Sequence, residues 1–167
     1  MDDLELISSR LGQTFLKAER YGPSVSEGSW HGPSLMESLD GVDHAVAGSR
    51  PIRGRHSIWE IVVHCAYWME EVARALLVGK MVSVEEVGDW PDTGVTPGEW
   101  ERDLARLWAA HGELAGAIGA LDEGDLERTL GSHFGGNYFE FTYRKMLHGV
   151  SDHNVYHAGQ ISILKKK

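Results

Sequence analysis

The sequence predicts an all-α protein, a four-helix bundle with a short extra helix between the first and second long helices. Four long segments repeat apolar residues at helical spacing, and no segment repeats the alternation of period two that is typical of strands. Most connections between these segments contain glycine or proline. Because the 167 residues include no low-complexity linker, we expect one domain that spans residues 1–167.

The first long helix is expected at residues 3–19, where the helical pattern ends before Gly22-Pro23. The glycine- and serine-rich stretch that follows precedes Ser34, which can cap a helix. Residues 35–46 then repeat apolar residues at helical spacing, and they form the predicted short extra helix.

Capping boxes mark the starts of the next two long helices. Ser57 and Glu60 open a strongly apolar helix that stops at Gly79. Thr96 and Glu99 open another, with proline at the first helical position. Both starts are therefore predicted from local chemistry alone.

Two other segments have less regular patterns. Residues 82–94 carry glycines and a proline between acidic residues, so we expect a loop over one end of the bundle, in which Trp90 could fold back over an opening. Residues 126–141 precede the last long helix, which is expected at residues 142–164. Within them, Gly135-Gly136-Asn137 either turns a short hairpin or merely breaks a loop.

Composition argues against several classes of partner and location. The formal charge of -9 would repel phosphate backbones, so nucleic acid is not expected. A single cysteine rules out a disulfide within the chain, and the first residues lack the features of a secretory signal. No apolar stretch approaches the roughly 20 residues of a membrane span. We therefore expect a cytoplasmic protein with no membrane partner.

The strongest functional signal is the pair His153 and His157. Their spacing puts both imidazoles on one helix face, about one turn apart, where they can bind one metal ion. About half of one such pair is expected by chance in a sequence with this many histidines. Position strengthens the signal, because both lie on the apolar stripe of the last helix. The stripe consists of Met146, Val150, His153, His157, Ile161 and Leu164.

His64 could supply a third imidazole, since it lies in the apolar helix that starts after Ser57. The alternative for all three histidines is a hydrogen-bonded place in a packed core. His111, on the stripe of the third long helix, is a rival for the ligand role. Gln160 could hold a ligand ring or a bound water from behind.

Other catalytic motifs are not found in the sequence. A zinc protease of the HExxH type needs glutamate directly after its first histidine, and that position is Asn154. Neither a GxSxG elbow nor a GxxxxGK[ST] loop occurs, and Cys65 lacks an obvious activating setting. The metal is the only chemistry that the sequence indicates, and catalytic residues beyond its ligands are not identified.

The helix around His64 and the closing segment HNVYHAGQI, residues 153–161, resemble the DinB-like (YfiT-like) superfamily of bacterial metalloproteins. The resemblance implies a four-helix bundle, usually a homodimer, that binds one zinc or nickel ion through His64, His153 and His157. Characterised relatives include transferases and isomerases that use low-molecular-weight thiols such as bacillithiol, mycothiol or glutathione. Some members are described as metal-dependent hydrolases.

We therefore expect a metal-dependent transferase that joins a small thiol to an electrophile, because coordination to a metal deprotonates a thiol. One alternative is a hydrolase that uses a metal-activated water. Another is a non-catalytic metal-binding or stress-response bundle. A structural zinc would need a fourth protein ligand, for which His111 and Glu60 are the candidates.

Overall fold

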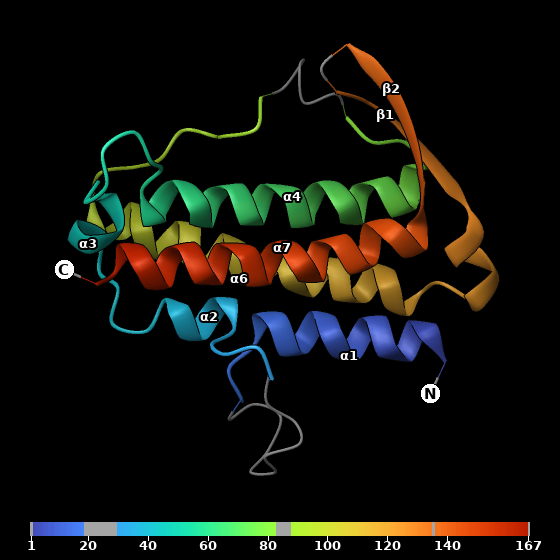
Figure 1. Ribbon diagram of the computed structural model, residues 1–167, viewed down its shortest axis with the longest axis horizontal. Coiled ribbons are helices and arrows are strands. Elements are labelled where there is room, and N and C mark those ends of the chain that lie inside the picture. Colours follow the sequence, from blue (N-terminus) through green and yellow to red (C-terminus); the bar gives the residue numbers. More distant parts are fainter. Residues whose placement is uncertain (1, 19–29, 83–87, 135, 167) are drawn as a thin grey trace.

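The computed structural model describes residues 2–18, 30–82, 88–134 and 136–166. Four long helices run along the molecule, and the predicted all-α class is confirmed (Figure 1). They are α1 (Asp3–Phe15), α4 (Ile58–Val78), α6 (Pro97–Gly119) and α7 (Tyr143–Leu164). In the described part of the chain, no helix is both long and apolar enough to cross a membrane. Gly22-Pro23, residues 83–87 of the predicted loop, and Gly135 lie outside the described residues.

The four helices form a closed ring of neighbours. α4 packs against α6 and α7, and α1 packs against the same two helices from the other side. Because α4 and α7 are adjacent, residues that are far apart in sequence lie side by side along this seam (Figure 1). The apolar stripes of all four helices meet in one core, in which Trp59, Phe15, Leu107 and Tyr143 are almost completely buried.

The connection from α1 to α4 differs from the prediction. α1 ends at Phe15, before the predicted end at residue 19. The predicted helix at residues 35–46 is two short helices, α2 (Leu35–Ser38) and α3 (His44–Gly48). They separate because Gly41 adopts a positive φ of 72° and Asp43 begins a new cap, accepting a hydrogen bond from the Val46 N–H at 2.9 Å.

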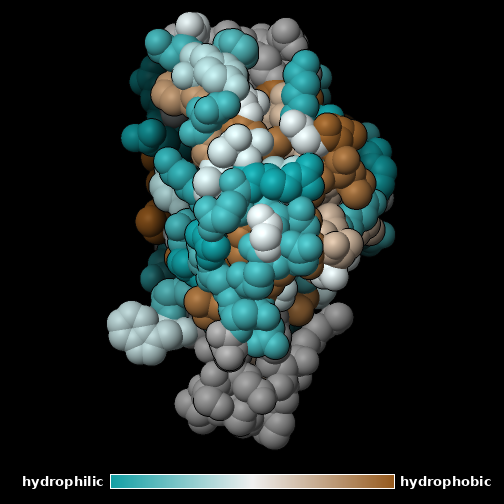
Figure 2. Space-filling model, turned by 90° about the vertical axis from the view of Figure 1, so that its right-hand side faces the viewer, coloured by the Kyte–Doolittle hydropathy of each residue, from teal (hydrophilic) through white to brown (hydrophobic). Residues whose placement is uncertain are grey.

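The segment before α7 forms a hairpin, one of the two alternatives that the sequence allowed. A short 3-10 helix, η2 (Glu123–Glu127), leads into strands β1 (Thr129–Phe134) and β2 (Asn137–Thr142). The strands pair antiparallel, with Thr129 opposite Thr142 and Phe134 opposite Asn137. Figure 2 views this end of the bundle, where a mainly hydrophilic surface is interrupted by small hydrophobic groups.

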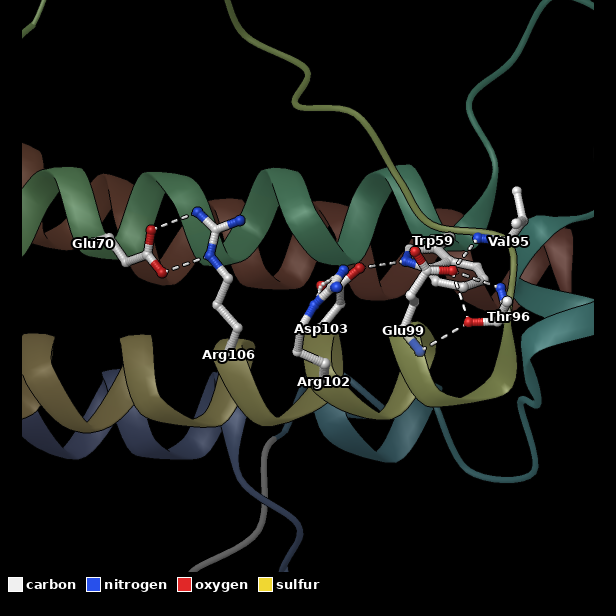
Figure 3. A network of polar contacts seen from close by, with 8 residues as sticks. All are labelled: Trp59, Glu70, Val95, Thr96, Glu99, Arg102, Asp103 and Arg106. Atoms are coloured by element: carbon white, nitrogen blue, oxygen red, sulfur yellow. Dashed lines mark hydrogen bonds and ion pairs between the residues drawn. The ribbon is translucent and has the colours of Figure 1, made fainter.

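Polar contacts fix α4 against α6 (Figure 3). The indole N–H of Trp59 donates to the buried carboxylate of Asp103 at 2.8 Å. Arg106 donates two hydrogen bonds to Glu70, at 2.7 and 2.6 Å, one α6 turn further on. At the start of α6, Glu99 accepts hydrogen bonds from the backbone of Val95 and Thr96 and completes the predicted capping box.

Candidate metal centre

The structure brings together the three histidines that the sequence singled out. His64 projects from α4, and His153 and His157 project from α7 across the seam between these helices. Nε2 of His153 lies 3.0 Å from Nε2 of His64 and 3.0 Å from Nε2 of His157. One nitrogen from each ring falls within a group whose members all lie within 4.8 Å of one another.

The opposite nitrogens of two rings have fixed hydrogen-bond partners. Nδ1 of His64 lies 2.8 Å from the backbone carbonyl oxygen of Asp89, and Nδ1 of His157 lies 2.8 Å from Oε1 of Gln160. Both partners are acceptors, so each Nδ1 carries the proton and donates it. The lone pairs of both rings are therefore on Nε2, facing His153.

In this arrangement the nitrogens at the centre of the cluster have more lone pairs than protons to bind them. His153 Nε2 can offer one proton at most, whereas two lone pairs from His64 and His157 point toward it. A divalent ion resolves the conflict, because it accepts all three lone pairs at once. Nitrogens bound to zinc at the usual length and at tetrahedral angles are separated by about 3.3 Å, close to the separations seen here. The residues therefore fit a metal ion.

Burial keeps the three imidazoles in the form that binds metal. Burial lowers the pKa of His153 to about 3, and the neighbouring His157 and His64 contribute in the same direction. Burial likewise lowers the pKa of His157 to about 4. The pKa of His64 is lowered by burial although its bond to the Asp89 carbonyl opposes the shift. All three rings are neutral at pH 7, as metal ligands must be.

The segment at Asp89 and Trp90 covers the His64 side of the cluster. The Asp89 carboxylate accepts a hydrogen bond from the Trp68 indole at 2.8 Å, which fixes the carbonyl that holds His64. The Trp90 ring stacks on His64, with centroids 4.1 Å apart, and on His56, with centroids 3.5 Å apart. Trp90 thus folds back over the site, as the sequence analysis suggested. Asp89 was missed because it acts on His64 mainly through a backbone carbonyl, which no sequence pattern marks.

The candidates for a fourth ligand lie elsewhere. His111 stacks on Phe15 of α1, with ring centroids 4.1 Å apart, and burial lowers its pKa to about 4. Glu60 accepts hydrogen bonds from the backbone of Ser57 and from Arg50. Within the described residues, the cluster contains neither of them. It thus holds three protein donors.

Cys65 and Asn154 both lie in the buried interior of the bundle. Cys65 is completely buried in α4, and burial raises the pKa of its thiol. Asn154, which occupies the place of a protease glutamate, is buried and donates a hydrogen bond to the Thr14 hydroxyl at 3.3 Å. It therefore helps to join α7 to α1.

Two cavities reach the cluster from different sides. The first, of about 320 Å³, is bordered by His153 and by apolar side chains of α4 and α7. The second, of about 470 Å³, is bordered by His157, Gln160 and Trp90, and it also contains the polar side chains of Arg55 and His56. A molecule in either cavity would contact one of the three imidazoles.

Comparison with known proteins identifies a family. The family model described as the DinB superfamily matches residues 29–161, which is more than half of the chain and includes all three histidines and Gln160. No curated protein and no solved structure matches the chain.

Proposed function

Because the chain belongs to the DinB superfamily, we propose that it is a metal-dependent transferase that joins a low-molecular-weight thiol to a small electrophile. The observation that carries the proposal is the donor set, which consists of three neutral imidazoles whose lone pairs converge on one point. Three protein donors leave a coordination position for an exogenous ligand, whereas structural zinc sites are usually closed by four. Zinc or nickel would suit three imidazoles.

A divalent ion held by His64, His153 and His157 would keep a coordinated thiol deprotonated at neutral pH and so supply a nucleophilic sulfur. The residues behind the ligands orient them for this task. Asp89 and Gln160 fix the rings of His64 and His157 through their Nδ1 protons. Trp90 stacks on the His64 ring, which is buried.

The cavity beside His157 has polar side chains among its apolar walls, and these support an approach of the thiol from that side. Arg55 and His56 line it together with Gln160 and Tyr156. A small thiol such as glutathione carries carboxylates, and the Arg55 guanidinium can pair with one of them. The thiol sulfur would then lie toward His157.

Hydrolysis is supported by no comparable observation. A metal-activated water needs a partner that positions it or accepts its proton, and the sequence offers Glu60, Gln160 or a residue of the loop at 82–94 for this role. Glu60 is engaged with Ser57 and Arg50. Gln160 already accepts a hydrogen bond from the His157 Nδ1–H group, and the carboxylate of Asp89 in the loop accepts one from the Trp68 indole. The homodimer that the resemblance implies stays a prediction.

The first test is elemental analysis of the untagged protein beside His64→Ala and His157→Ala. We expect about one zinc or nickel ion per chain, lost in both variants because two imidazoles bind far less tightly than three. His148→Ala is the matched control, since His148 lies on the same helix as His157 but contacts Asp3, at 3.6 Å. The control should retain the metal.

The second test measures conjugation of bacillithiol, mycothiol and glutathione to 1-chloro-2,4-dinitrobenzene, with and without metal. Metal-loaded protein should accelerate the reaction of one of these thiols over the metal-free protein. Metal binding without acceleration for any thiol would contradict the transferase but not the metal site. A wild type that stays free of metal after reloading with zinc and nickel would contradict both.

A further inference from the structure

The apolar cavity beside His153 is lined mainly by residues of α4 and α7, the two helices that carry the histidines. These two helices lie side by side (Figure 1). The walls of the cavity are almost entirely apolar side chains. They include Trp68, Met69, Val72, Phe141, Met146 and Val150. A cavity of about 320 Å³ within such walls is at the lower end of the sizes that small-molecule sites have.

The two ends of this cavity differ in chemistry. His153 borders it and presents Nε2 to the histidine cluster. Met69 and Val72 are 1% and 3% exposed, so they form the floor. Lys145 is exposed and is the one formally charged side chain among the described residues that line the cavity, so it lies at the opening. The cavity therefore leads from a cation at the surface, over apolar walls, to the candidate metal centre.

We propose that this cavity binds the electrophilic substrate, and that this substrate is an elongated apolar molecule with one anionic group, which pairs with Lys145 while the apolar body extends toward His153. This inference rests on the proposed function, because it assigns the second substrate of the same centre. The volume sets the size, since a liquid water occupies about 30 Å³ and the cavity thus holds about ten heavy atoms.

The assignment divides the two substrates by polarity. The cavity on the other side of the cluster contains Arg55, His56 and Gln160 and suits a polar thiol. The cavity beside His153 offers an apolar molecule the greater contact, because its walls have few polar groups to desolvate. Each substrate would thus approach the cluster by its own route, one at His153 and the other at His157.

Binding of octanoate tests this assignment, because octanoate has ten heavy atoms and one anionic end. Isothermal titration of the zinc-loaded full chain should show one site, with affinity rising about fourfold per methylene from butyrate to octanoate. Lys145→Gln should weaken octanoate about threefold to tenfold and leave octan-1-ol unchanged. Octylammonium, which has the same chain and the opposite charge, should bind more weakly than octanol.

Gly149 offers a way to fill the cavity without disturbing the fold. It lines the cavity from α7, and a Cβ added there would have no neighbour within 4 Å. Gly149→Leu should weaken both octanoate and octanol more than tenfold. Gly112→Leu is the control, because Gly112 is an equally unhindered helical glycine on α6 that does not line this cavity.

Several outcomes would overturn the inference. Octanoate that does not bind, or that binds Gly149→Leu as well as wild type, would show that the cavity is not the site. If octanoate binding is lost when zinc is removed, and octanol does not bind at all, the carboxylate coordinates the metal instead. Zinc and thiol activity without octanoate binding would leave the proposed function standing, whereas octanoate binding without metal uptake would remove that function and keep the cavity as a site.

Discussion

At the scale of single residues, the direction of each ring nitrogen decides what the site can bind. The Asp89 backbone carbonyl and the Gln160 side-chain carbonyl accept hydrogen bonds from the Nδ1–H groups of His64 and His157, and this leaves Nε2 as the metal-binding nitrogen in both rings. An imidazole without such a partner can present either nitrogen or accept a proton in place of a metal ion. The two hydrogen bonds therefore prepare the ligand set before any ion arrives.

His111 gives a prediction about pH at this scale. Burial lowers its pKa to about 4, whereas an unfolded histidine has its ordinary value near 6.5. Between these two values the unfolded chain takes up a proton at this position and the folded chain does not, so folding stability falls as the pH falls. Protonation of His111 in the unfolded chain should by itself lower the free energy of unfolding by about 2 kcal/mol between pH 7 and pH 5.

Urea denaturation of the metal-free protein at both pH values measures this cost. His111→Leu removes the titrating group and a buried nitrogen, Nε2, that lacks a partner among the described residues. Between pH 7 and pH 5, the free energy of unfolding of the variant should fall by about 2 kcal/mol less than that of wild type. His133→Asn, at an exposed position of β1, should behave as wild type. An equal loss in wild type and His111→Leu would refute the assignment.

The sequence predicted the parts of this site in which a side chain itself would bind the metal. Two histidines one turn apart on an apolar stripe predict a shared ligand face, and His64 stands out because its helix is otherwise apolar. Asp89 contributes a backbone carbonyl, which every residue possesses, so its role follows only from the path of the loop. His56 stacks on Trp90, which is distant in sequence, and such a contact leaves no local pattern.

At the scale of elements, the bond between Trp59 and Asp103 joins α4 to α6 through a buried carboxylate. Asp103→Ala should lower the free energy of unfolding by about 2 kcal/mol, because the Trp59 N–H then stays buried without an acceptor. Asp103→Asn keeps an acceptor and should cost less. Urea denaturation at pH 7 provides the measurement.

Arg102→Ala is the control for this prediction. Arg102 is exposed and pairs with the same carboxylate at 3.0 Å, and a surface ion pair of this kind contributes less than about 1 kcal/mol. If Asp103→Ala costs no more than Arg102→Ala, the indole bond does not stabilise the interface.

The starts of the helices were easier to predict than their ends. Ser57, Thr96 and Thr142 accept hydrogen bonds from backbone N–H groups of the first turn, and this chemistry is complete within four residues. The end of α1 and the division between α2 and α3 depend on packing and on the turn at Gly41, which a continuous apolar pattern hides. The sequence did not decide between a hairpin and a loop at residues 126–141, because a hairpin depends on pairing between two strands and not on a local pattern.

At the scale of the whole molecule, the histidine cluster joins two helices that are separated by most of the second half of the chain. An ion that binds only the folded chain must stabilise it. Zinc at a thousandfold excess over its dissociation constant should add about 4 kcal/mol, which corresponds to a rise in Tm of about 10 °C for a chain of this size. Differential scanning calorimetry with and without zinc measures the rise.

His64→Ala separates this linkage from nonspecific binding. The variant should show no rise in Tm with zinc, because α4 then lacks its ligand, whereas His148→Ala should rise as wild type does. A similar rise in His64→Ala would place the stabilising zinc at some other site.

The buried thiol of Cys65 has a consequence for a protein that handles electrophiles. Cys65 follows His64 directly in sequence, yet α4 turns it into the core, where it is completely buried. The reactive compounds that the proposed enzyme would process cannot reach it, so the catalyst is not consumed by its own substrate. The folded chain also contributes no competing thiol of its own, and every conjugate formed in an assay reports on the thiol that was added.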